Sequence, residues 1–82
     1  MKISELWKHY ERDKTIIGYS NVTLKSYSIQ NRLLAKALGE PDIKDVTYDQ
    51  LKEYLYQQTQ LKPSSVGHRV RFIRSFFRWA VD

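Results

Sequence analysis

Hydroxyl, imidazole and guanidinium groups gather near the end of the chain, in residues 64 to 80, which read SSVGHRVRFIRSFFRWA. The polar residues recur there at spacings of 4, 3, 4 and 3: Ser64, His68, Arg71, Ser75 and Arg78. Because a helix turns about 100° per residue, this spacing predicts one polar face. Short hydroxyls near a helix N-terminus, followed by longer donors, suit phosphate, since the N-terminus already attracts anions. The face is a candidate anion-binding surface, and an ordinary solvated helix face is the alternative.

The usual patterns of a catalytic site are missing from the sequence. There is no cysteine, no glycine-rich phosphate loop, no serine elbow and no helix with paired histidines. His9 and His68 are the only histidines and are too far apart in sequence to suggest a metal site. A small nuclease would need an acidic or histidine cluster, which the sequence lacks. We therefore predict no catalytic residue, no metal and no cofactor. His68 is either an exposed polar residue or a hydrogen-bond donor to the ligand, and we favour the donor.

Positive charge is concentrated in the last quarter of the chain. Residues 62 to 82 carry +4 of the net charge of +5, with Asp82 as their only acid. The other 61 residues have nine lysines and arginines against eight acids, so they are nearly neutral. This asymmetry predicts a polyanion as the partner.

Size and composition indicate one all-α domain spanning residues 1–82. A chain of 82 residues has room for a single core. Apolar residues make up 41%, too many for disorder, and three glycines and two prolines leave few breaks between long elements. No apolar run approaches the ~20 residues that span a membrane, and the N-terminus lacks a signal peptide. We expect no membrane partner and a cytoplasmic protein.

Two helices are predicted in the first half of the chain from apolar spacing and end signals. The first is expected to begin with Ser4 as N-cap and to end near Asp13. The second is expected to begin at Ser20 as N-cap and to stop at Gly39, which can adopt a left-handed conformation.

Two further helices are predicted in the second half. Thr47 and Gln50 have the spacing of a capping box, and Pro63 suits the first position of the last helix. The apolar residues expected to form the main core ladder of that helix are Val66, Val70, Ile73, Phe77 and Ala80. Phe72 and Trp79 lie between this ladder and the polar face, where core packing or a domain interface is expected of them.

Three segments together resemble the core-binding domain of tyrosine recombinases, the phage integrase family. They are SNVTLKSY, then LGEPDIKDVTYDQLKEYL, then PSSVGHRVRFIRSFFRWA, and the likeness covers nearly the whole chain. The resemblance implies a four-helix, SAM-like orthogonal bundle that forms half of a C-shaped clamp around duplex DNA. The family's catalytic Arg, His and Tyr belong to a separate domain, which would begin where this chain stops.

The resemblance also implies DNA contacts in the major groove of the core recombination site. The matching positions on the second and fourth helices are Thr23, Lys25, Ser26, Ser64, Ser65 and His68. Arg71 and Arg78 join them from the polar face described above, and we favour a phosphate contact for Arg71. Ser65 stands where the family more often has threonine, Gly67 where it often has a polar residue, and Asn31 where it often has an apolar one.

The expected function is therefore DNA binding in integration and recombination, by a protein encoded by a bacterium, phage or mobile element. The resemblance implies a tetramer on DNA for the full-length recombinase and a monomer for the isolated domain. The alternative is a small helical adaptor that binds another protein through the flank of Phe72 and Trp79.

Overall fold

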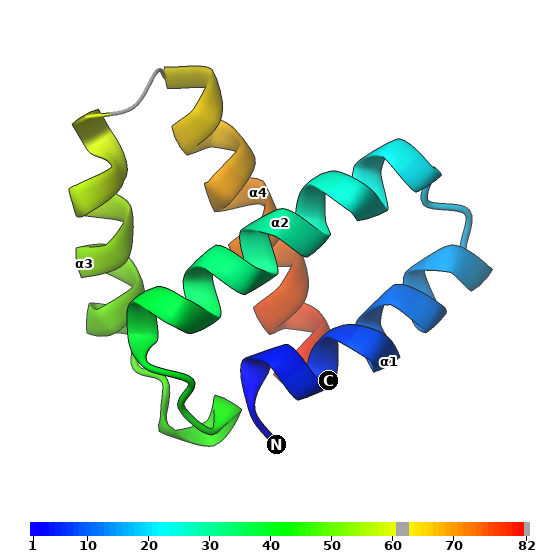
Figure 1. Cartoon of the computed structure of the whole chain (residues 1–82), viewed down its shortest axis with the longest axis horizontal. Coiled ribbons are helices and arrows are strands. Elements are labelled where there is room, and N and C mark those ends of the chain that lie inside the picture. The colour runs from blue at the N-terminus through cyan, green and yellow to red at the C-terminus, as the bar shows by residue number, and fades with distance from the viewer. Residues whose placement is uncertain (61–62, 82) are drawn as a thin grey trace. The chain divides into compact units, whose positions relative to one another are not determined.

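The chain is all-α, as predicted. The computed structural model describes residues 1–60 and 63–81, and it has no strand within them (Figure 1). The elements are α1 (Ile3–Ile16), α2 (Asn21–Leu38), η1 (Ile43–Asp45), α3 (Tyr48–Gln57), η2 (Gln58–Gln60) and α4 (Pro63–Val81), where η marks a 3₁₀ helix. They form two compact units, Met1–Asp45 and Val46–Asp82. The SAM-like bundle and the single domain over residues 1–82 remain predictions.

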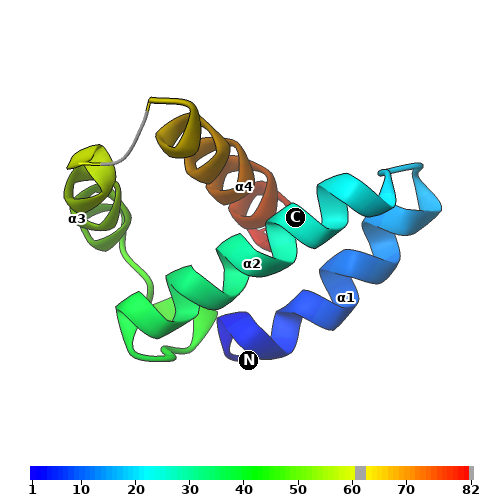
Figure 2. The same ribbon diagram turned by 45° about the horizontal axis from the view of Figure 1, so that its top comes forward.

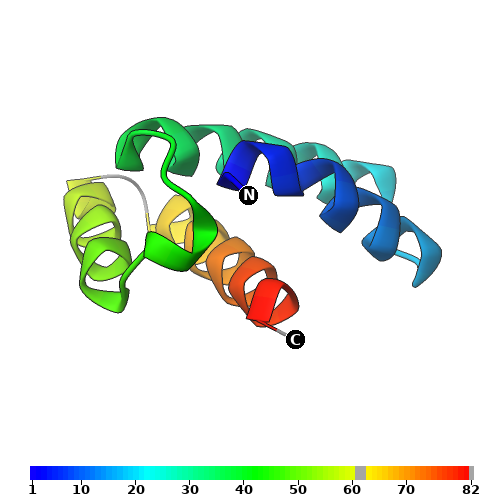
Figure 3. The same cartoon turned by 90° about the horizontal axis from the view of Figure 1, so that it is seen from below.

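In the first unit α1 and α2 pack against each other, and the chain reverses direction between them (Figure 3). The predicted ends of α2 are confirmed. The Ser20 hydroxyl accepts a hydrogen bond from the Thr23 amide at 3.2 Å, which satisfies one of the free amides at the start of the helix. Gly39 closes the helix with a φ of 78°, a left-handed value that suits a residue without Cβ.

The predicted start of α1 is wrong. Lys2, and not Ser4, is the N-cap, and its amide donates to the Glu5 carboxylate at 2.9 Å. The Ser4 hydroxyl instead donates to the Glu40 carboxylate at 2.7 Å, a contact across 36 residues that no local pattern reveals. The helix also continues past Asp13 to Ile16.

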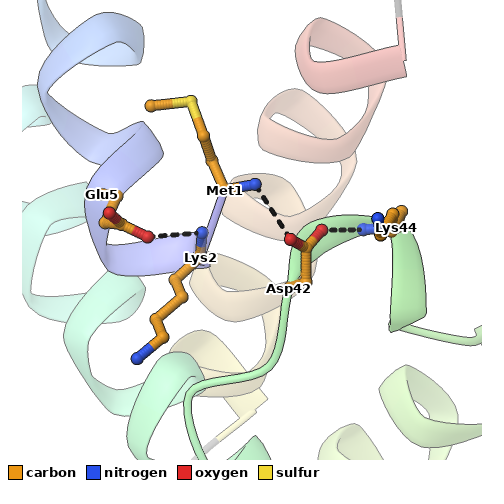
Figure 4. A network of polar contacts seen from close by, with 5 residues as sticks. All are labelled: Met1, Lys2, Glu5, Asp42 and Lys44. Carbon is orange, nitrogen blue, oxygen red and sulfur yellow. Dashed lines mark hydrogen bonds and ion pairs between the residues drawn. The ribbon is translucent and has the colours of Figure 1, made fainter.

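Polar contacts join the chain's first residues to the loop after α2 (Figure 4). The Met1 ammonium group donates to the Asp42 carboxylate at 3.0 Å, and the Lys44 amide donates to the other oxygen of that carboxylate at 3.1 Å. The Ile43 amide donates to the Met1 carbonyl at 2.9 Å. The Lys44 hydrogen bond, helped by the ammonium group, lowers the pKa of Asp42.

The buried side chains of the first unit come from both of its long helices. Ile3 and Tyr10 are buried on α1, and Leu24 and Leu34 are buried on α2. Asn31 is the buried polar residue among them, and its Nδ2 donates a long hydrogen bond of 3.5 Å to the Ile3 carbonyl. This long bond accommodates a polar side chain in an otherwise apolar environment.

In the second unit α3 contacts α4 (Figure 2). The predicted capping box is confirmed, because the Gln50 amide donates to the Thr47 hydroxyl at 3.2 Å and the Thr47 amide donates to the Gln50 side chain at 2.9 Å. Tyr54 is the buried residue of α3, and its hydroxyl accepts from the Arg69 guanidinium at 2.9 Å. Pro63 is the first residue of α4, as its sequence position predicted.

The predicted core ladder of α4 is largely wrong. Of its five members only Ile73 is buried, whereas Phe72 and Phe76 are 1% and 0% exposed. The ring of Phe76 lies 5.3 Å from that of Phe72 and 5.7 Å from that of Trp79, centre to centre. This helix carries two apolar stripes, the predicted ladder and the aromatic stripe of Phe72, Phe76 and Trp79. The aromatic stripe packs in the core because burying its larger side chains removes more apolar surface from water. Because Phe72 is buried, it cannot form the exposed partner surface of the adaptor alternative.

Within the described ranges, no helix combines the length and apolar character needed to cross a membrane.

Candidate nucleic-acid interface

Three arginines form an exposed stripe on α4. Arg71, Arg74 and Arg78 are spaced by three and four residues, which places them on one side of the helix. All three are exposed, on the side away from buried Phe76. In the part of the chain that the structure describes, none of them makes an ion pair or hydrogen bond with another side chain. We call these residues the arginine stripe.

Arg74 was not among the predicted site residues, although the sequence contains the signal for it. It lies three residues after Arg71 and four before Arg78, so the alternation of three- and four-residue spacings used for the polar face also fits the arginines. The predicted face included Ser75 instead, whose side chain is half-buried. The exposed face of α4 is therefore more basic than the predicted one.

Gly67 continues the stripe toward the start of the helix, four residues before Arg71. A Cβ placed on Gly67 would meet no atom within 4 Å, so packing within the chain does not require a glycine there. The missing side chain leaves the backbone open to a ligand at the end of the stripe.

The other predicted residues of α4 differ in accessibility. His68 is exposed beside the arginine stripe, and Ser65 is half-buried. Ser64 belongs to the first turn of α4, but its side chain lies outside the described part of the structure. Nothing in the geometry tests a DNA role for these three residues, which remains a prediction.

A second basic stripe follows α2 in the first unit. Lys25, Arg32 and Lys36 are all exposed, and their spacings of seven and four residues place them on one side of the helix. Exposed Ile29 lies between Lys25 and Arg32 on the same side. We call Lys25, Arg32 and Lys36 the α2 stripe.

The predicted contact residues of α2 do not share one face. Thr23 and Lys25 lie about 160° apart around the helix axis, with Ser26 between them. Lys25 belongs to the exposed stripe, whereas Thr23 and Ser26 are half-buried. The Thr23 hydroxyl also accepts a hydrogen bond from the Ser20 hydroxyl at 3.0 Å, so it takes part in the helix cap. Lys25 is the predicted α2 residue most accessible to a ligand.

Acidic and histidine side chains do not cluster in the described ranges, where no group of three or more could hold a metal ion. Among the described residues of α2 and α4, the exposed polar side chains are mainly those of lysine and arginine.

Comparison with protein-family models, with curated proteins and with solved structures finds no match to this chain.

Proposed function

We propose that this chain is a DNA-binding domain that holds duplex DNA through basic faces on α2 and α4. The observation that carries the proposal is the arginine stripe, three exposed guanidinium groups without an acidic partner in the described residues. Arginine is suited to phosphate because its planar fork of donors matches the phosphate oxygens. Three neighbouring positive charges add little to the stability of a helix face that meets only solvent. The same three charges favour the binding of a polyanion.

The sequence resemblance gives this activity a biological setting, that of the core-binding domain of a tyrosine recombinase. In that setting the chain positions the recombination site, and a separate domain cuts and joins the strands. Three features support this assignment. The fold is all-α, and the cap at Ser20 and the capping box at Thr47 both lie in the sequence segments that resemble the family. We accordingly propose no catalytic step for the residues of this chain.

Titration of isotopically labelled chain with a short duplex tests the proposal. Amide shifts should be largest in α2 and α4, around Lys25 and Arg71, and affinity should be weak, about 10⁻⁴ to 10⁻⁶ M at physiological salt, because few phosphates are neutralised. The proposal fails if the duplex produces no saturable shifts at low salt.

A protein-binding adaptor is the second candidate, and a different surface favours it. Tyr48 and Tyr56 on α3 are 74% and 71% exposed, and the Lys52 ammonium group lies 5.2 Å above the centre of the Tyr48 ring. Exposed aromatic residues are typical of protein interfaces. In the same titration, insensitivity to DNA together with shifts on α3 when a protein partner is added would favour the adaptor.

A further inference from the structure

A groove between α1 and α2 is lined by more basic than acidic side chains. Its volume is about 540 Å³. Lys8 and Arg12 line it from α1, and Lys25 lines it from α2. Glu11 is the only acidic residue among the described residues that line it. We call this feature the α1–α2 groove.

Helix geometry explains why these groups face each other. Lys8 and Arg12 are four residues apart on α1, so both side chains project from one side of that helix. On α2 the lining includes Asn21, the first residue of the helix, and the first turn contains no acid to offset the positive end of the helix dipole. The groove therefore combines cationic side chains with a favourable helix terminus.

The cations of the groove are accessible to a ligand. Lys8, Arg12 and Lys25 are all exposed. The Arg12 guanidinium lies 3.5 Å from the Asp13 carboxylate, but this pair is on the surface, with side-chain exposures of 68% and 43%. Such surface pairs contribute little and can exchange for a stronger acceptor.

We propose that the α1–α2 groove binds a backbone phosphate of duplex DNA, which extends the DNA-binding surface from α2 onto α1. This inference rests on the proposed DNA-binding function. Lys25 favours DNA over a free phosphate ion, because it belongs both to the groove and to the exposed α2 stripe. A strand that follows the stripe therefore reaches the groove at this residue.

Two charge changes of opposite sign test the proposal in the full chain. Lys8→Gln should weaken binding of a duplex about threefold near physiological salt and reduce the slope of log K against log salt by ~1. Glu11→Gln should strengthen binding, because it removes the acid from the groove, and a gain of affinity cannot come from loss of folding. Lys44→Gln, which removes an exposed lysine of η1 outside the groove, is the matched control and should leave the slope unchanged.

The outcomes separate this inference from the proposed function. If Lys8→Gln and Glu11→Gln both bind like the parent while changes to the arginine stripe weaken binding, the groove proposal is wrong and DNA binding stands. If the parent binds no duplex, both proposals are wrong. Titration with inorganic phosphate distinguishes the source, because saturable shifts at the groove with phosphate but none with the duplex would overturn the DNA assignment.

Discussion

Arg69 and Arg71 are two residues apart in sequence, but the fold gives them different environments. The Arg69 guanidinium donates to the Tyr54 hydroxyl from a half-buried position, so it links α3 to α4. Arg71 is exposed on the arginine stripe. Charge counting along the sequence treats both as equal contributors to a basic segment. The structure separates a packing residue from a candidate phosphate ligand.

Asp42 is one residue through which pH should affect the stability of the first unit. Its pKa is lowered by the Lys44 amide and the Met1 ammonium group, so its stabilising contribution is complete above the ordinary pKa of an aspartate, about 4. The contribution is lost as pH falls through the lowered value. We expect Asp42→Asn to melt below the parent at neutral pH, with the difference shrinking in more acidic solution.

Thermal unfolding across the pH range measures this effect. Asp45→Asn, which neutralises an exposed carboxylate of η1, the short helix that follows Asp42, is the control and should keep the parent's profile. Equal melting of Asp42→Asn and the parent at every pH would show that the ion pair with Met1 contributes nothing.

At the scale of whole helices, the positions where helices begin and end were predicted from the sequence more accurately than the faces that they bury. Ser20, Gly39, Thr47 and Pro63 were identified correctly, because capping depends on residues within a few positions of each other. Ser4 was misassigned, since its hydroxyl bonds to a residue 36 positions away. Local patterns cannot report a contact of that kind.

The buried face of α4 was missed for a related reason. Its sequence contains two apolar stripes of helical period, and periodicity alone does not say which one packs. The exposed side was predicted more accurately, with Arg71 and Arg78 correctly placed away from the core. Arg74 was overlooked because the predicted face combines polar residues of mixed type, whereas the observed stripe is purely basic.

Substitution of the two phenylalanines tests the corrected core face. Phe76→Ala should cost ~3 to 5 kcal/mol by opening a cavity, whereas Phe77→Ala should cost distinctly less because its side chain is only half-buried. Urea denaturation measures both, and Phe76→Leu replaces the alanine variant if the latter does not fold. A larger loss at Phe77 than at Phe76 would restore the original core assignment.

Gly67 allows stability and binding to change in opposite directions. Gly67→Ala should stabilise α4 by roughly 0.5 to 1 kcal/mol, since the added methyl group meets nothing within 4 Å and alanine is the better helix former. Affinity for DNA should nevertheless fall, because that methyl group occupies space at the end of the arginine stripe. Thermal melting and duplex titration of the same variant check the two effects, and undiminished affinity would exclude close approach of DNA at Gly67.

For the molecule as a whole, the net charge of +5 does not show that the cations are concentrated on particular helix faces. Lysines and arginines lie along one exposed side of α2 in the first unit, and arginines lie along one exposed side of α4 in the second unit. Because each stripe by itself neutralises few phosphates, binding should be weak and should depend only modestly on salt. Phosphate contacts carry no sequence information, so binding should also depend weakly on sequence.

The most direct test of the central claim is the salt dependence of duplex binding by Arg71→Ala. The free energy of unfolding of this variant should differ from that of the parent by no more than about 0.5 kcal/mol, because the side chain is exposed. If Arg71 contacts a phosphate, affinity should fall equally for duplexes of different sequence, and the slope of log K against log salt should shrink by ~1. Lys52→Ala, which removes an exposed cation from α3, should bind like the parent. An Arg71→Ala variant with the parent's affinity and salt slope would show that the arginine stripe is only a solvated helix face and would contradict the proposed mode of DNA binding.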